Sequence, residues 1–247
     1  MNSELMDVKE KNLMVSTMAE NLIGSEIILL AWQINEKIAK GQKIFNLTIG
    51  DFDPNIFPIP DKLTEEIKKA YDDHQTNYPP AEGSMELRKV VSKYIKERGN
   101  LDYGPDEILV TSGARPIIFA TYNTVVDLDD VVIFPVPSWN NNHYCHLTRS
   151  RVITVETRPE DNFMPTAKEL EPHIKDATLI SLCSPLNPTG TCFTENEIRN
   201  ICDLVVEENN RRGDDEKPLY VLFDQIYWQL TLGKTKHYNP VVINPAM

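Results

Sequence analysis

The sequence predicts an α/β protein of three layers, in which helices cover both faces of a mostly parallel sheet. Two observations carry this prediction. Short apolar, β-branched runs bounded by turn residues recur along the chain and are expected to form strands at 108–111, 131–135, 152–156, 179–184 and 220–224. The segments between these runs have the amphipathic pattern of helices, and this alternation is typical of parallel strands covered on both sides.

Helix boundaries are marked most clearly by two capping boxes, Thr166 with Glu169 and Thr194 with Glu197. In each pair the side chains satisfy free N–H groups of the first turn, so a helix is expected to begin directly after each threonine. Further helices are expected at 61–73, 84–98 and 115–126. The charged segment 209–218 lacks apolar periodicity and predicts an exposed turn, with the basic pair Arg211-Arg212 on a solvated face.

The N-terminal 45 residues predict one amphipathic helix, because Ile27, Leu30, Ile34 and Ile38 are spaced to share a face. A short strand is expected next, within 44–54, where glycine, acids and proline interrupt it. This gives two parts, an N-terminal helical arm at 1–45 and a larger domain at 46–247.

Charge and cysteine content exclude several function classes. The 247 residues carry a net charge of −12, which would repel nucleic acid and anionic membrane surfaces, so neither is expected as a partner. None of the four cysteines forms a CxxC pair. The acids Glu4, Asp7 and Glu10 occupy the start of the chain, where a signal peptide would need basic residues and then an apolar run. A reducing, cytoplasmic location is therefore expected.

The first candidate motif is Thr111-Ser112-Gly113-Ala114, which lies between an expected strand and an expected helix. Small residues there let backbone N–H groups and a hydroxyl approach an anion, and the helix dipole favours negative charge. The motif indicates phosphate binding, although Ser-Gly-Ala is also an ordinary turn.

The second motif, 137–144, follows the expected strand at 131–135 and contains Trp139. Its indole ring is suited to stacking on a flat heteroaromatic ring, and equally to packing in a core or an interface. His143, Cys145 and His146 also suggest a metal site, but they lack a partner cluster elsewhere in the chain, so no metal is expected.

The third and fourth motifs also follow expected strands. Asn187, in Ser-Pro-Leu-Asn-Pro-Thr-Gly, offers a side-chain amide that can donate to a ring oxygen, whereas the prolines and glycine alone would fit a structural turn. Asp224 ends an apolar run and Tyr227 follows three residues later. A partly desolvated carboxylate favours a nearby protonated nitrogen, although an aspartate after a strand is also a common helix N-cap.

In this order the four motifs resemble the fold-type I aminotransferases of the aspartate aminotransferase group. Asn-Pro-Thr-Gly followed by Asp-x-x-Tyr is the most specific part, and the resemblance runs from about residue 44 to the end. It implies the three-layer large domain of the pyridoxal phosphate (PLP)-dependent transferases, with 46–247 forming its N-terminal part. It also implies amino-group transfer from an amino acid to a 2-oxo acid.

The resemblance implies a role for each matching residue. The PLP phosphate would rest on Ser112, Gly113 and Ala114, and the ring would stack on Trp139. Residues that would contact the ring's phenolic oxygen are Asn187 and Tyr227.

Asp224 would pair with the pyridinium nitrogen and keep it protonated, which makes it the main electronic residue. Gly50 would lie beside the substrate carboxylate. Tyr78 would reach the phosphate of a partner subunit, which implies a homodimer.

Three features depart from the family pattern. The first is that Asp127-Leu128-Asp129-Asp130 lacks the glycine usually found before the next strand. Arg115-Pro116 is unusual after the phosphate turn, and the family's Schiff-base lysine is expected beyond Asp-x-x-Tyr, where only Lys234 and Lys236 occur, in a polar loop-like stretch. We therefore expect a chain truncated before that lysine and inactive by itself.

Three alternatives remain open at this point. The first is another PLP reaction on the same fold, such as a β-lyase or a cyclopropane-forming synthase. The second is a non-catalytic binding subunit. The third, a nucleotide-binding domain, is disfavoured because GxGxxG and GxxxxGK[ST] are both absent from the sequence.

Overall fold

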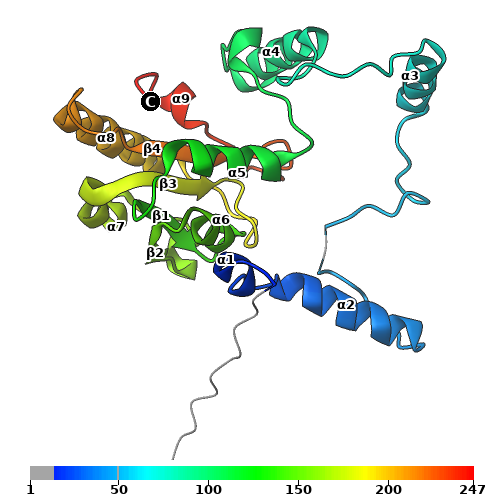
Figure 1. Ribbon diagram of the computed structural model, residues 1–247, viewed down its shortest axis with the longest axis horizontal. Helices are drawn as coiled ribbons and strands as arrows, with labels where there is room; N and C mark the ends of the chain where they lie inside the picture. Colours follow the sequence, from blue (N-terminus) through cyan, green and yellow to red (C-terminus); the bar gives the residue numbers. More distant parts are fainter. Residues whose placement is uncertain (1–13, 49) are drawn as a thin grey trace, which may run out of the picture. The chain divides into compact units, whose positions relative to one another are not determined.

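The computed structural model describes residues 14–48 and 50–247, and the chain divides into two compact units, Met1–Pro80 and Ala81–Met247 (Figure 1). The boundary between these units differs from residue 45, where the sequence predicts the end of an arm. The division into an arm and a cofactor-binding domain therefore stays a prediction.

The first unit contains α1 (Thr17–Glu20), α2 (Glu26–Ala39) and α3 (Asp61–Asp72). The single helix predicted up to residue 45 is wrong, because the described part of this region holds two helices with a break around Gly24. Glycine costs about 1 kcal/mol inside a helix, which favours a break there. No strand forms in the described residues 44–48 and 50–54, where no neighbouring strand supplies hydrogen-bond partners.

The second unit is built on a four-stranded parallel sheet in the order β2-β1-β3-β4. The strands are β1 (Val131–Val136), β2 (Arg151–Glu156), β3 (Ala177–Cys183) and β4 (Tyr220–Asp224). All four confirm strands that the sequence predicts from their β-branched and apolar residues. The central strands β1 and β3 are buried along almost their whole length, whereas most residues of the edge strand β2 are exposed. β2 lies on one side of β1 in the sheet, and β3 followed by β4 lies on the other side.

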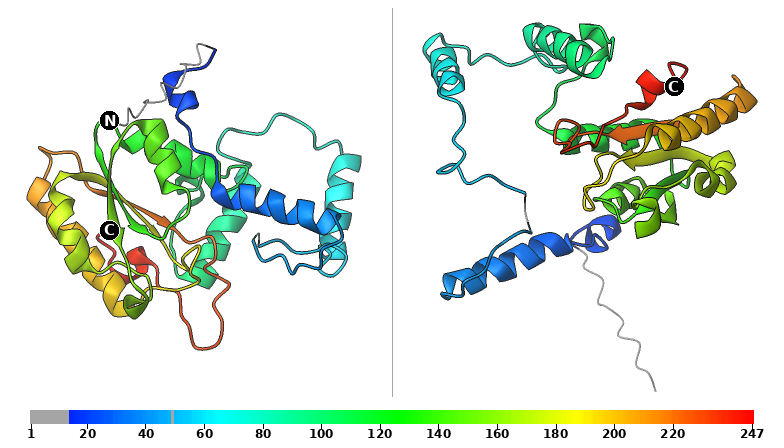
Figure 2. Two further views of the ribbon diagram at one scale, coloured as in Figure 1. Left: turned by 90° about the horizontal axis from the view of Figure 1, so that it is seen from below. Right: turned by 180° about the vertical axis from the view of Figure 1, so that it is seen from behind.

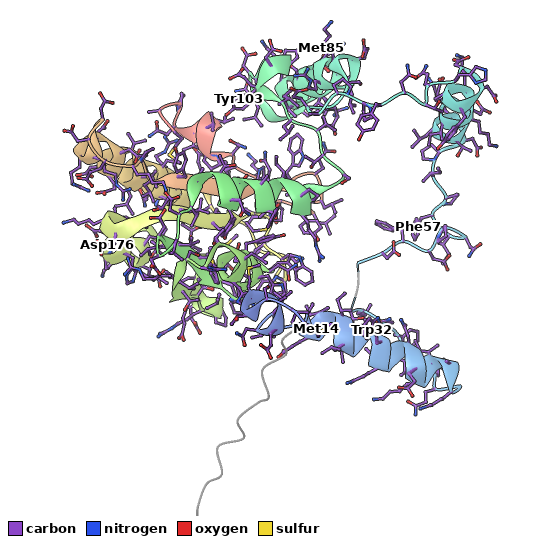
Figure 3. The ribbon with its side chains drawn as sticks, in the orientation of Figure 1. Met14, Trp32, Phe57, Met85, Tyr103 and Asp176 are labelled. Atoms are coloured by element: carbon purple, nitrogen blue, oxygen red, sulfur yellow. The ribbon has the colours of Figure 1, made fainter. Side chains whose placement is uncertain are left out.

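The helices of the second unit precede, connect and follow these strands. They are α4 (Met85–Gly99), α5 (Ala114–Val125), α6 (Asn141–Thr148), α7 (Ala167–Leu170), α8 (Glu195–Arg212) and α9 (Pro240–Ile243), with 3-10 segments η1 (Pro105–Glu107), η2 (Pro159–Asp161) and η3 (Glu171–Asp176). Both capping boxes are confirmed at the starts of α7 and α8. Asp176, labelled in Figure 3, ends η3 directly before β3.

Alternate residues of the strands enter two separate cores, as the period of two in a strand requires. Ile133 and Ile180 pack with α7, η3 and α8, whereas Val132 and Leu179 pack with α5 and α6. Figure 2 shows α5 and α6 on one side of the sheet and α8 on the other. The three-layer α/β architecture that the sequence predicts is therefore confirmed in this unit.

Residues 108–111 do not form the predicted strand. This segment runs beside Glu82, whose carbonyl accepts a hydrogen bond from the Val110 N–H at 3.0 Å, but no ladder follows. Gly83 has a φ of +90°, and a Cβ there would lie 2.7 Å from Cβ of Val110. Glycine at position 83 therefore permits this close approach of the two segments.

The exposed turn predicted at 209–218 is partly wrong, because α8 continues to Arg212. Arg211 is exposed as predicted, but Arg212 is only 6% exposed. Its guanidinium donates to Glu208 Oε1 at 2.8 Å and to the carbonyls of Ile174 and Ala177 at 2.7 and 2.9 Å. Arg212 thus ties the end of α8 to the start of β3.

Candidate functional site

A cavity of about 240 Å³ opens at the carboxyl ends of β3 and β4, beside the segment that follows β1. The connections from β1 and from β3 run to opposite sides of the sheet, and in open α/β sheets such a switch point is where ligands bind. The lining residues come from α5, α6, the ends of β3 and β4, and the loops that follow β1, β3 and β4. They are Ala114, Arg115, Ile118, Trp139, Asn141, Tyr144, Ser181, Leu182, Cys183, Asn187, Leu222, Asp224, Ile226 and Tyr227.

Asp224 enters the cavity because it is the last residue of β4 and shares a face with Leu222. Its carboxylate Oδ1 accepts a hydrogen bond from the backbone N–H of Ile226 at 3.0 Å. This contact begins a turn that brings Tyr227, which is 36% exposed, to the same cavity. The carboxylate and the phenol predicted to act together therefore line one site.

Asn187 reaches the cavity from the loop after β3. This loop is closed by two backbone hydrogen bonds, from Leu186 N to Thr191 O at 2.8 Å and from Gly190 N to Leu186 O at 2.7 Å. The loop therefore turns back on itself and holds Asn187 near the carboxyl ends of the strands, where it lines the cavity with Asp224.

Trp139 lies in the turn between β1 and α6 and is half-buried. The Arg115 guanidinium carbon lies 5.9 Å from the centroid of the Trp139 ring, within cation–π range. No carboxylate of the described residues forms an ion pair with Arg115. The cavity therefore contains an aromatic surface and a cation that is available to an anion.

The phosphate motif lies at the N-terminus of α5. Gly113 has a φ of +108°, a conformation that favours glycine, and Thr111 Oγ1 donates to the Gly113 carbonyl at 2.7 Å. Ala114 begins α5 and lines the cavity, whereas Ser112 and Gly113 are exposed beside it and are not part of its lining. Five of the nine predicted site residues, Ala114, Trp139, Asn187, Asp224 and Tyr227, thus share the cavity.

Sequence reasoning missed a buried polar network in the wall of the cavity. Asn141 is 9% exposed, and its Oδ1 accepts hydrogen bonds from Tyr122 Oη at 3.0 Å and from Ser181 Oγ at 2.9 Å. These contacts join α5, α6 and β3. Asn141 lies within a run of three asparagines, and no signal in the sequence distinguishes the buried one from its neighbours.

Burial and charge both act on the polar groups around the cavity. Burial raises the pKa of Tyr144, the positive charge of Arg115 opposes this rise, and the carboxylate of Asp224 adds to it. Burial also raises the pKa of Cys183 to about 12. Both side chains are therefore protonated near neutral pH.

Two predicted residues, Gly50 and Tyr78, lie in the first unit. Tyr78 is fully exposed, and its contact with a partner subunit stays a prediction. Lys234 and Lys236 line a separate cavity with Gly190 and Cys192, and neither lines the cavity that contains Asp224. Among the described residues, no helix is long and apolar enough to cross a membrane.

Comparison with known proteins identifies a family. The family model for aminotransferase class I and II matches residues 42–244. An aspartate aminotransferase of Bacillus subtilis is 27% identical over 220 residues, which is 88% of this chain and 53% of the relative. A probable N-acetyl-LL-diaminopimelate aminotransferase of the same organism is 31% identical over 205 residues, which is 82% of this chain and 49% of the relative.

Solved structures agree with this result. An aspartate aminotransferase from Thermus thermophilus with maleate has a TM-score of 0.81 at 26% identity and covers 94% of this chain and 58% of its own. An aromatic aminotransferase from Pyrococcus horikoshii has a TM-score of 0.70 at 26% identity, over 78% of this chain and 49% of its own. The chain thus spans about half the length of the relatives that it matches.

Proposed function

Because this chain belongs to the aminotransferase class I and II family, we propose that the protein moves an amino group from an amino acid to a 2-oxo acid with PLP. In this proposal the chain supplies the non-covalent contacts to the cofactor. The supporting observation is that Ala114, Trp139, Asn187, Asp224 and Tyr227, from four separate motifs, line one cavity.

The cavity fits a small ligand that has a flat ring, a ring oxygen and a phosphate. Its volume of about 240 Å³ lies below the ~300–1,000 Å³ typical of sites for drug-sized molecules, which suits a single-ring cofactor. The indole of Trp139 offers a flat surface, and the amide of Asn187 and the phenol of Tyr227 offer donors to a ring oxygen. The N-terminus of α5 offers backbone N–H groups to a phosphate.

Asp224 has the central role in the proposed mechanism. PLP supplies a conjugated ring that accepts electrons from the substrate's α-carbon, and it does so best with a protonated ring nitrogen. The carboxylate of Asp224 would hold that proton in place, because an adjacent negative charge stabilises the cationic form. The N–H of Ile226 fixes the orientation of this carboxylate.

The remaining assigned residues bind and orient. Ser112, Gly113 and Ala114 would hold the phosphate, and Arg115 would add positive charge on the same side. Gly50 would contact the substrate carboxylate. Tyr78 would contact the phosphate in the partner subunit of a homodimer, which we propose as the assembly, in the cytoplasm.

Other PLP reactions on this fold are the closest competing function, because the cavity residues would serve the cofactor in any of them. The cavity does not contain Lys234 or Lys236. A covalent link to either lysine is therefore not part of the proposal.

Hydrogen exchange with pyridoxamine phosphate tests the proposed site. This compound has the ring and phosphate of PLP without an aldehyde that reacts with surface lysines. We expect saturable binding that slows amide exchange at 113–115 and 224–227 while leaving 195–212 unchanged. Absence of binding, or protection confined to other segments, would rule out the proposed site.

A further inference from the structure

A second polar cluster lies directly behind Asp224, on the opposite side of the chain. The Asp224 side chain lines the cofactor cavity, whereas the next side chain, Gln225, lines two different cavities and not that one. From Gln225 the chain makes an excursion through Tyr227 and returns at His237 and Asn239. Both of these residues contact the Gln225 amide, with His237 Nε2 at 3.0 Å and Asn239 Nδ2 at 2.8 Å from Gln225 Oε1. The contacts of Gln225 with His237 and Asn239 therefore join the two ends of the loop that carries Tyr227.

The hydrogen bonds of this cluster determine which atoms carry protons. Asn239 Oδ1 accepts from the backbone N–H of Val241 at 3.0 Å, so its Nδ2 must be the group facing Gln225. The Gln225 atom facing this donor is consequently the oxygen. Because an amide oxygen only accepts, His237 must be protonated at Nε2.

The other nitrogen of His237 is buried without a partner. Nδ1 has no hydrogen-bond partner, and in the Nε2–H tautomer it is a bare acceptor. The ring is held between aromatic side chains, with centroids 5.9 Å from Phe223 and 6.4 Å from Trp228. A second proton would place a buried N–H donor at Nδ1 with nothing to accept it, which is costly.

We propose that His237 is a positioning residue for the cofactor site: as a neutral Nε2–H donor it clamps Gln225 together with Asn239, and so fixes the carboxylate of Asp224 and the phenol of Tyr227 toward the cavity. The inference rests on the proposed function for the identity of the ligand. The clamp itself rests on contacts within the chain.

The clamp predicts a dependence on pH. Burial lowers the pKa of His237 below its usual value of 6.5. The charged residues Arg98 and Lys236 line the adjoining cavity together with His237 and Tyr238. The protonated imidazole keeps its Nε2–H, but its unpaired N–H at Nδ1 favours displacement of the ring from this buried place. Because the pKa is lowered, the clamp is complete above pH 6.5 and weakens as the pH falls through the lowered pKa.

Two substitutions at position 237 separate the hydrogen bond from the packing. His237→Phe keeps a ring beside Phe223 and Trp228 but removes the donor. His237→Gln keeps an N–H donor and does not titrate. The same two substitutions at His173, in η3, serve as matched controls outside the cluster.

Binding of pyridoxamine phosphate is measured for each variant from pH 5 to 8. We expect His237→Phe to weaken binding about three- to tenfold at pH 8, the loss equivalent to one hydrogen bond. His237→Gln should bind within about twofold of the wild type at pH 8 and decline less steeply below pH 6.5. Unchanged binding by His237→Phe, or an acid decline in His237→Gln as steep as in the wild type, would overturn the proposal.

Exchange of the Ile226 amide, measured without ligand, separates this inference from the proposed function. That N–H donates to Asp224 Oδ1, so its exchange should quicken at least about threefold in His237→Phe and remain slow in His237→Gln. If the wild type binds no pyridoxamine phosphate while this pattern holds, the clamp stands and the cofactor assignment fails. If exchange is equal in all variants, the clamp fails. If His237→Phe does not fold, Gln225→Leu replaces it in the experiment. This substitution removes the shared acceptor and should therefore have the effect expected of His237→Phe.

Discussion

Cys183 lies directly opposite Asp224 in the parallel pairing of β3 with β4, and the backbone N–H of Ser184 donates to the Asp224 carbonyl at 2.9 Å. This register brings together the ends of two strands that are about forty residues apart in sequence. The loop that carries Asn187 and the turn that carries Tyr227 both begin at this point. The register of β3 with β4 therefore determines which polar groups meet in the cavity.

Asn141, in the wall of the cavity, should be a main determinant of stability. Its replacement by alanine removes the acceptor for the hydroxyls of Tyr122 and Ser181, and each buried hydroxyl left unpaired costs about 1–3 kcal/mol. Chemical denaturation should show this loss in the free energy of unfolding. The exposed neighbour Asn142 is the control, and its replacement by alanine should change stability by less than about 0.5 kcal/mol. Equal stability of the two variants would contradict the network.

Trp139 should contribute to ligand affinity through its ring. Replacement by alanine is expected to weaken pyridoxamine phosphate binding about three- to tenfold, because stacked aromatic pairs contribute about 0.5–1.5 kcal/mol. Phenylalanine should recover part of this affinity. Trp32, which is 66% exposed in the first unit, provides a control whose replacement by alanine leaves the affinity unchanged. Equal affinities for Trp139→Ala and the wild type, measured by calorimetry, would show that the ring does not contact the ligand.

Cys183 should resist alkylation in the folded chain. Burial raises its pKa to about 12 from 9.0, which lowers the thiolate fraction at pH 8 by a factor on the order of a thousand. Mass spectrometry after treatment with iodoacetamide should therefore find Cys183 unlabelled in the native chain and labelled in urea. Similar labelling rates in both conditions would contradict the burial of this thiol beside the cavity.

Glu208 should stabilise the end of α8 in a pH-dependent way. Hydrogen bonds from Arg211 and then Arg212 lower its pKa from 4.5 to about 2. Because the pKa is lowered on folding, the stabilisation is complete above pH 4.5 and is lost as the pH falls toward 2. Glu208→Gln should cost about 3 kcal/mol at pH 7, since Arg212 would remain buried without its carboxylate. Denaturant unfolding at several pH values should show that the free energy of unfolding falls less between pH 4.5 and 2 in this variant than in the wild type. In the control Glu207→Gln, at an exposed position, the loss should match the wild type.

The strands of the second unit could be predicted from sequence because each is a β-branched or apolar run, which in β1 and β3 is buried almost throughout. Residues 108–111 have a similar composition and failed as a strand, because strand formation also requires a neighbour with free hydrogen-bonding groups. Capping boxes were more reliable, since all of their partners lie within one turn of the helix.

Long-range contacts explain what the sequence could not reveal at the site. Arg211 and Arg212 are adjacent, yet only Arg212 is buried, because its acceptors include carbonyls 35 and 38 residues away. Asn141 and His237 were missed for the same reason, since their partners lie on other elements. The place of Asp224 at the cavity was predictable because it ends an apolar run within the Asp-x-x-Tyr motif, both of which are local features of the sequence.

Nitrogen NMR of ring-labelled pyridoxamine phosphate tests the central claim most directly, because it reports whether the ring nitrogen is protonated. Bound to the wild-type chain at pH 8, the ring nitrogen should be protonated; bound to Asp224→Asn it should be unprotonated, while the exposed control Asp215→Asn should behave as the wild type. An identical protonation state in the wild type and Asp224→Asn would contradict the placement of the Asp224 carboxylate against the cofactor nitrogen.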